Sequence, residues 1–165
     1  MSELRIGIGV DVHPFAAAPV ADDDRVLTLG GVRFPGETVL VGHSDADAVA
    51  HAICDAVLGA AGLGDLGAHF PDTDETWRGA DSLALLQRCV ELVGAEGWRL
   101  VNADCTLVAE RPKVAPAREA MVERLSRAAG GPVHVKATRP EGLGSLGRLE
   151  GLGCLAVALL ERDAR

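Results

Sequence analysis

The stretch from Val41 to Gly64 restricts the fold more than any other part of the chain. Its apolar positions predict a buried helix, but histidines and acidic residues gather at its start and along one side. Ser44 followed by Asp47 resembles a capping box, and Asp47, His51 and Asp55 recur along one helical stripe. We therefore interpret the helix start as an anion-binding position and the stripe as a candidate metal-binding wall.

The segment Arg5–Val12 alternates with the period of a β-strand. One face is aliphatic, and the other passes from glycine to Asp11 and His13. Two ligands hold a divalent ion poorly, but His51 as a third would leave one position open, as catalytic zinc requires. Asp55 could then orient an imidazole. The structural alternative is a strand end, a turn and a satisfied helical histidine.

Helical and strand patterns alternate along the rest of the chain, with an exposed loop expected from Pro14 to Arg25. Leu152–Leu160 is apolar on every side and fits either a buried helix or a strand buried on both faces. The interleaving predicts an α/β (α+β) fold, in which helices pack on one face of a mixed β-sheet. The other predicted strands are Val26–Leu29, Val32–Phe34, Val39–Gly42, Leu100–Ala109 and Val133–Thr138, and the other helices are Ala80–Glu96 and Pro116–Gly130.

Composition limits the possible functions. With 165 residues and 48% hydrophobic content, the chain is expected to form a single domain over residues 1–165. A net charge of −8 argues against nucleic-acid binding, although local groups can still bind a small anion. The four cysteines form no C-x-x-C pair, which favours reduced thiols. No apolar run is long enough to span a membrane, so we expect a cytoplasmic protein.

Three loops carry further candidate residues, each with a plainer alternative. Phe70–Asp74 is either a loop that covers a substrate or a polar turn, and Glu110–Lys113 either reads a nucleobase edge or is a solvated loop. Gly142–Gly147 matches G-x-G-x-x-G, but the chain ends too soon for a Rossmann unit. It could still form a phosphate-binding nest beside Arg148, with Glu141 as a magnesium ligand or a surface acid.

Four motifs in order resemble the 2-C-methyl-D-erythritol 2,4-cyclodiphosphate synthase family. They are RIGIGVDVHPF, GHSDADAVAHAICDAVLGAAGLGDLGAHFPDTD, NADCTLVAERPK and VKATRPEGLGSLGRLEG. The resemblance implies a ferredoxin-like domain that assembles as a homotrimer with active sites between subunits. It also implies a lyase of non-mevalonate isoprenoid biosynthesis. Its substrate would be 4-diphosphocytidyl-2-C-methyl-D-erythritol 2-phosphate, which is cyclised with release of CMP.

The resemblance also implies roles for individual residues. Asp11, His13 and His51 would bind Zn²⁺, which narrows the helix stripe to His51 and leaves Asp47 as a capping residue and Asp55 as an acid that orients an imidazole or supports the fold. Glu141 would bind Mg²⁺ or Mn²⁺ between substrate phosphates. The catalytic residues would be His43, Thr138 and Arg139. The substrate-binding residues would be Asp11, Val12, His13, His43, Ser44, Asp65, Leu66, Gly67, Phe70, Pro71, Asp72, Thr73, Asp74, Ala109, Glu110, Arg111, Pro112, Lys113, Thr138, Glu141, Ser145 and Arg148.

Two positions depart from the family pattern. Arg139 stands where many members have a threonine, and Ser145 stands where phenylalanine is frequent near the trimer axis. Two rival functions use the same ligands. A zinc hydrolase would need a general base such as Asp55 or Asp65, and a metal-stabilised binding protein would need a closed metal shell and no nucleotide pocket.

Overall fold

The computed structural model describes residues 2–17 and 25–163 and contains a four-stranded sheet in the order β1-β6-β4-β5. β1 (Ser2–Pro14) and β4 (Arg99–Val108) both pair antiparallel with β6 (Gly151–Asp163), and β5 (Val133–Thr138) pairs parallel with β4. A separate hairpin joins β2 (Leu27–Leu29) to β3 (Val32–Phe34). Of the loop expected from Pro14 to Arg25, residues 18–24 lie outside the described residues.

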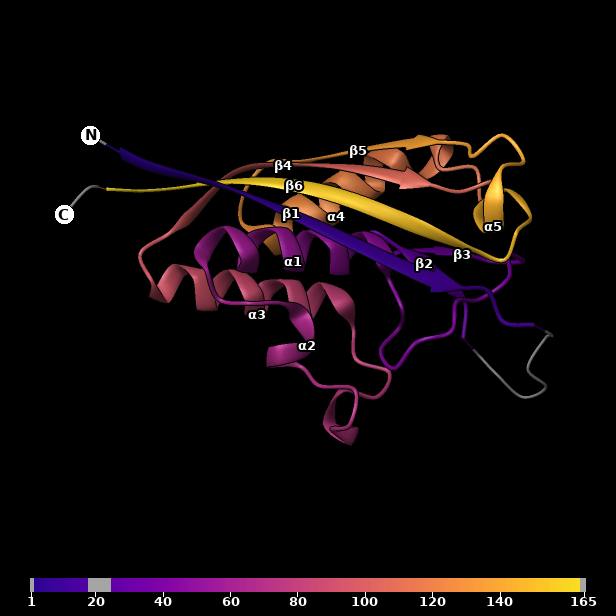
Figure 1. Cartoon of the computed structure of the whole chain (residues 1–165), viewed down its shortest axis with the longest axis horizontal. Coiled ribbons are helices and arrows are strands. Elements are labelled where there is room, and N and C mark those ends of the chain that lie inside the picture. The colour runs from indigo at the N-terminus through magenta and orange to yellow at the C-terminus, as the bar shows by residue number, and fades with distance from the viewer. Residues whose placement is uncertain (1, 18–24, 164–165) are drawn as a thin grey trace.

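Three helices cover one face of the sheet (Figure 1). α1 (Ala48–Ala61) packs on β1 and β6, α4 (Arg118–Ala129) packs on β5, and α3 (Ser82–Ala95) packs on α1 and α4. The short helices are α2 (Leu66–His69), α5 (Gly144–Gly147) and the 3-10 turns η1 (Glu75–Trp77) and η2 (Ala115–Ala117). The α+β class, with helices packed on one face of a mixed sheet, is thereby confirmed.

The ferredoxin-like expectation is wrong in its order of elements, which would be β-α-β-β-α-β. α4 lies between β4 and β5, and β5 is followed by β6 with only the short α5 between them. A crossover helix returns the chain to the same end of the sheet, so β4 and β5 are parallel.

Glycines on the inner face of β1 let α1 approach the strand closely. A Cβ placed on Gly7 would lie 2.0 Å from the carbonyl oxygen of Ala56, and one on Gly9 would lie 1.9 Å from that of Ala52. No side chain fits at such distances. The helix meets the strand with alanines that are fully buried, so the contact fixes the position of α1 over the sheet.

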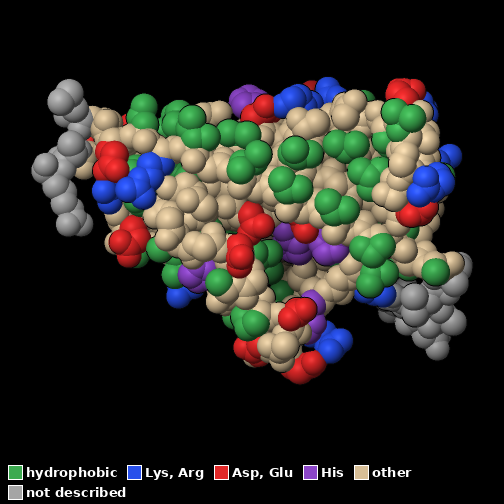
Figure 2. All heavy atoms as spheres, viewed as in Figure 1, with side chains coloured by type: hydrophobic (Ala, Val, Ile, Leu, Met, Phe, Trp, Pro, Cys, Tyr) green, Lys and Arg blue, Asp and Glu red, His purple; other side chains and the backbone are tan. Residues whose placement is uncertain are grey.

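The outer face of β1 and β6 is apolar and exposed. Ile6 and Ile8 are 74% and 66% exposed, and Leu155 and Val157 also face outward. Figure 2 shows hydrophobic side chains scattered over this face of the molecule. Leu152–Leu160, which periodicity left undecided, is part of strand β6. Leu155 and Val157 on its outer side stay exposed in a single chain, because the long helices α1, α3 and α4 lie on the other face of the sheet.

The start of α1 differs from the predicted capping box. The N-cap is Asp47, whose carboxylate accepts hydrogen bonds from the backbone N–H groups of Val49 and Ala50. It also accepts bonds from Gly30 and Gly31, at 2.8 and 2.6 Å. Asp47 is completely buried there, which raises its pKa to about 6. It therefore joins α1 to the β2–β3 hairpin, and the capping assignment for Ser44 is wrong.

One predicted strand is wrong, and the expectation for the cysteines is confirmed. Val39–Gly42 forms no regular strand, and only an isolated bridge joins Phe15 to Leu40. The four cysteines are free and buried, as expected for structural thiols. Among the helices of the described residues, none is both long and apolar enough to cross a membrane.

Candidate active site

Asp11, His13 and His51 come together where β1 meets α1. One ligand atom from each residue lies within 4.8 Å of those of the other two. Asp11 Oδ2 lies 2.9 Å from His13 Nε2 and 3.1 Å from His51 Nδ1. The strand places the first two side chains on its inner face, and α1 brings the third against them because the glycines before Asp11 allow close packing. This is the triad that the sequence predicted as a metal site.

The protonation of His13 shows why this cluster suits a cation. His13 Nδ1 lies 2.8 Å from the carbonyl oxygen of Val41, which can only accept, so Nδ1 carries the proton. His13 Nε2 is buried and has no hydrogen-bond partner among the described residues; its approach to Asp11 lacks the alignment of a hydrogen bond. When the His13 ring is neutral, the lone pair on its Nε2 and the Asp11 carboxylate therefore face the same point.

The electrostatics of the cluster agree with that geometry. Burial raises the pKa of Asp11, but the hydrogen bond with His51 and the charge interaction with both imidazole rings hold it well below its usual range. Burial lowers the pKa of His13, but the Asp11 carboxylate, the Val41 carbonyl and Asp47 together raise it above its usual value. Without a cation, a proton would compensate for the buried negative charge of Asp11. A divalent ion could replace that proton.

Two acids of the predicted helix stripe do not belong to the metal cluster. Asp47 caps α1 and bonds the β2–β3 hairpin, so it is not available as a ligand. Asp55 accepts a hydrogen bond of 2.8 Å from the backbone N–H of Leu66, the first residue of α2. His51 alone of the stripe faces Asp11.

Beside the triad lies a pocket of about 470 Å³, here called the histidine pocket. In Figure 2, histidine side chains lie in a hollow below the apolar sheet face. His43 Nε2 contacts the carbonyl oxygen of Asp74 at 3.1 Å, which links the start of α1 to the loop that borders the pocket. Of the predicted substrate residues, those that line the histidine pocket are Asp11, His13, His43, Ser44, Leu66, Gly67, Phe70, Pro71 and Asp72.

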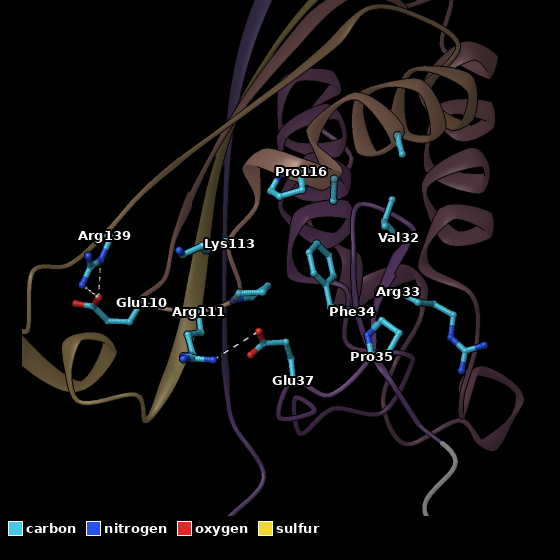
Figure 3. A pocket seen from close by; sticks show the side chains of 13 residues that line it. Val32, Arg33, Phe34, Pro35, Glu37, Glu110, Arg111, Lys113, Pro116 and Arg139 are labelled. Atoms are coloured by element: carbon cyan, nitrogen blue, oxygen red, sulfur yellow. Dashed lines mark hydrogen bonds and ion pairs between the residues drawn. The ribbon is translucent and has the colours of Figure 1, made fainter.

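A second pocket of about 760 Å³, here called the Phe34 pocket, lies between β3, the loop after β4 and the start of α4 (Figure 3). The predicted residues Glu110–Lys113 and Arg139 contribute to its wall. Arg139 Nε donates to the Glu110 carboxylate at 2.8 Å, and the same carboxylate accepts a bond of 2.8 Å from Gly142 N–H. These interactions with Gly142 and Arg139 lower the pKa of Glu110. Arg139 is thus tied to the loop rather than aimed at the metal triad.

The remaining predicted residues lie outside the histidine pocket of a single chain. Asp65 caps α2, and Val12 is 60% exposed on the opposite face of β1 from Asp11. Glu141 has a positive φ of 54° at the turn after β5, and Arg148 Nε bonds Glu150 at 2.7 Å. Thr73, Asp74, Ala109, Glu110, Arg111, Pro112, Lys113, Thr138, Arg139, Glu141, Ser145 and Arg148 are absent from the lining of the histidine pocket.

Sequence reasoning missed a contact to the triad from Ser82 and the role of Asp45 behind it. His51 Nε2 lies 2.8 Å from Ser82 Oγ, and Ser82 Oγ in turn donates to Asp45 Oδ1. Asp45 lies in the stretch that the sequence singled out, but Ser82 is far along the chain at the start of α3. No local pattern pairs the two.

The model of the YgbB family matches residues 4–161 of this chain. The chain belongs to the YgbB family. It is 50% identical to the 2-C-methyl-D-erythritol 2,4-cyclodiphosphate synthase of Syntrophobacter fumaroxidans, with 98% of this chain and 100% of that enzyme covered. The family relationship confirms the family resemblance that the sequence motifs indicated.

Some family relatives are longer. The chain is 55% identical to a bifunctional enzyme IspD/IspF of Anaeromyxobacter sp. over 96% of its own length, but it spans only 40% of that enzyme. The solved structure of a CDP complex of IspF from Plasmodium falciparum matches with a TM-score of 0.81 and 30% identity, over 98% of this chain and 97% of that one. The fold therefore occurs both alone and as part of longer enzymes.

Proposed function

We propose that this chain converts 4-diphosphocytidyl-2-C-methyl-D-erythritol 2-phosphate to 2-C-methyl-D-erythritol 2,4-cyclodiphosphate and CMP. The observation that carries the proposal is the triad of Asp11, His13 and His51 in the wall of a pocket, in which no described residue forms a hydrogen bond with His13 Nε2. Family membership supports the activity, and the CDP bound to the Plasmodium falciparum relative supports a cytidine nucleotide as part of the substrate.

The triad fits a resident divalent metal, which we take to be zinc. One carboxylate oxygen and two imidazole nitrogens are a common donor set for catalytic zinc. A bound ion would draw negative charge from phosphate oxygens of the substrate. Glu141 offers a hard oxygen ligand for a second ion, Mg²⁺ or Mn²⁺, shared with substrate phosphates.

The reaction itself requires one bond to form and one to break. An oxygen of the 2-phosphate attacks the β-phosphorus, and CMP leaves with the electron pair of the cleaved P–O bond. Positioning and electrostatic stabilisation dominate such a transfer. In the histidine pocket, His43 and Ser44 offer donors to phosphate oxygens, while Phe70 and Pro71 of the bordering loop exclude water.

The distribution of predicted residues supports an active site shared between subunits. The triad and the residues at Glu110–Lys113 line different pockets of one chain, so one chain alone does not put them around one substrate. We infer that a neighbouring copy supplies the cytidine-binding loop in a homotrimer. The exposed aliphatic face of β1 and β6 supports this assembly, because monomers rarely leave such a face in water.

Replacing Ile8 with glutamate tests the assembly. Ile8 is 66% exposed on the apolar face, and a carboxylate there would have to be buried without a partner in the trimer. We expect Ile8→Glu to sediment as a folded monomer without turnover. The control Gln87→Glu, at an exposed position of α3, should remain trimeric. A trimer of unchanged stability in Ile8→Glu would place the subunit interface elsewhere.

Arg139 is proposed to stabilise charge on the transferred phosphoryl group when substrate is bound. It would have to exchange its ion pair with Glu110 for a phosphate contact. We expect Arg139→Ala to lower kcat by at least about tenfold, with a smaller change in KM, as for loss of a transition-state donor. An unchanged kcat would assign Arg139 to loop structure only.

Phosphorus NMR of the complete reaction tests the function. The chain is incubated with the diphosphocytidyl substrate, Zn²⁺ and Mg²⁺, and we expect CMP and a cyclic diphosphate in equal amounts. Linear products, in which the diphosphate is hydrolysed without ring closure, would instead identify a zinc hydrolase. An absence of turnover by the metal-loaded chain would also reject the proposal.

A further inference from the structure

A buried chain of hydrogen bonds leads away from the metal triad on the far side of His51. His51 Nε2 lies 2.8 Å from Ser82 Oγ and 3.1 Å from Ser44 Oγ. Ser82 is completely buried. Its hydroxyl donates to Asp45 Oδ1, and its backbone N–H donates to Asp45 Oδ2 at 3.2 Å. Both oxygens of the Asp45 carboxylate are therefore directed at Ser82.

The direction of these hydrogen bonds follows from the number of protons. A serine hydroxyl has one hydrogen, and an ionised aspartate can only accept. Since Ser82 gives its hydrogen to Asp45, its oxygen can only accept from His51. His51 Nε2 must then carry a proton, and the lone pair of the neutral ring lies on Nδ1, the nitrogen that faces Asp11. The other contact, Ser44, is not held by a carboxylate in this way.

We propose that Ser82 and Asp45 are positioning residues that hold His51 in the tautomer and ring orientation required for metal binding. The inference rests on the metal site proposed above. Partners that fix the free nitrogen of a metal-binding histidine commonly change metal affinity by about 10- to 100-fold when removed. Ser82 and Asp45 would thus contribute to affinity without touching the ion.

The location of the pair gives it a second consequence. Ser82 begins α3 and directly follows the segment that borders the histidine pocket. Asp45 N–H donates to Ala80 O at 3.1 Å, and Gly79 N–H donates to His43 O at 2.8 Å. The end of that segment is therefore bonded to the start of α1 at the same place where His51 is oriented. Displacement of the segment would disturb the ring of His51.

Two substitutions separate positioning from simple support of the fold. Ser82→Ala removes the acceptor that Asp45 holds in place for His51 Nε2–H and leaves only Ser44 Oγ, at 3.1 Å. Asp45→Asn keeps the shape but replaces one acceptor with a donor. The asparagine either opposes Ser82 N–H or donates to Ser82 Oγ, which would turn the serine hydrogen toward His51 Nε2. Ser126→Ala is the matched control, because Ser126 Oγ accepts a bond from Val133 N at 3.0 Å in α4, away from the triad.

Zinc affinity of the metal-free full chain is measured by competition with a chromogenic chelator, and unfolding is measured on the same samples. We expect Ser82→Ala and Asp45→Asn to weaken zinc binding by about 10- to 100-fold, with affinity unchanged in Ser126→Ala. Nitrogen-15 NMR of the imidazoles at pH 8 should show a proton on Nε2 of His51, and a shift toward Nδ1–H in Asp45→Asn.

The outcomes distinguish the inference from the function on which it rests. If the unaltered chain binds no zinc, the metal site is wrong and the positioning role fails with it. If the unaltered chain binds zinc and both variants bind it equally well, the metal site stands and only the positioning role is rejected. Lower stability with unchanged affinity and tautomer would likewise reject it.

Discussion

Replacing His51 with alanine is expected to remove both bound zinc and turnover. His51 supplies one of three donors, and the remaining Asp11 and His13 come from a single strand and hold a divalent ion poorly. A metal contributes several kcal/mol to stabilising charge in phosphoryl transfer, so turnover should fall by more than about 100-fold. Metal content by atomic emission and CMP release by chromatography measure the two effects.

A second histidine provides the control for this experiment. His134→Ala removes an exposed imidazole from β5, outside the triad and the histidine pocket, and should leave zinc content and turnover unchanged. Full zinc occupancy in His51→Ala would refute the ligand assignment. Loss of turnover with zinc retained would leave His51 with a role in the reaction but not in metal binding.

Replacing Gly9 with alanine is expected to destabilise the whole fold. The added Cβ would lie 1.9 Å from Ala52 O and 2.7 Å from Ala56 N, and both atoms belong to the backbone of α1. A flexible side chain could move aside, but here the helix itself must move away from β1. We expect the free energy of unfolding to fall by about 3 kcal/mol or more, at the upper end for overpacking.

The matched control for Gly9→Ala lies in the helix that receives the clash. Gly59 is an exposed position of α1 where an added Cβ would have no atom of the described residues outside its own helix within 4 Å. Gly59→Ala should raise the free energy of unfolding by about 0.5–1 kcal/mol, because alanine favours helix more than glycine does. Urea unfolding and the yield of soluble protein measure both variants. A Gly9→Ala chain as stable as the original would contradict the close strand–helix contact.

The same contact shows which parts of the active site the sequence could predict. Alternation placed Asp11 and His13 on one face of a strand, and helical spacing placed His51 on one stripe with two acids, because both patterns depend only on local backbone geometry. The sequence also showed that the strand face with Asp11 and His13 carries glycines, which have no side chain. That α1 packs on that bare face, leaving the aliphatic face exposed, depends on contacts between distant segments.

Local patterns failed where a side chain has partners elsewhere in the chain. Asp47 looked like a member of a metal-facing stripe, but Gly30 and Gly31 bond its carboxylate in the folded protein. Leu152–Leu160 had no amphipathic period because it packs on α1 with one face and exposes apolar side chains on the other. Periodicity reports a boundary between apolar and polar surroundings, and this strand has apolar side chains on both faces.

The sequence by itself determined the residue types and spacing of the triad, the family and most of the helices and strands. The structure confirms Asp47 as the cap of α1. The tertiary structure decided that Asp47 also bonds the β2–β3 hairpin, that β5 runs parallel to β4, and that Ser82 and Asp45 lie behind His51. The physical reason is the distance along the sequence over which each interaction acts. Backbone periodicity and capping act within a few residues, whereas the hydrogen bonds that orient His51 join residues far apart in the sequence, which only packing brings together.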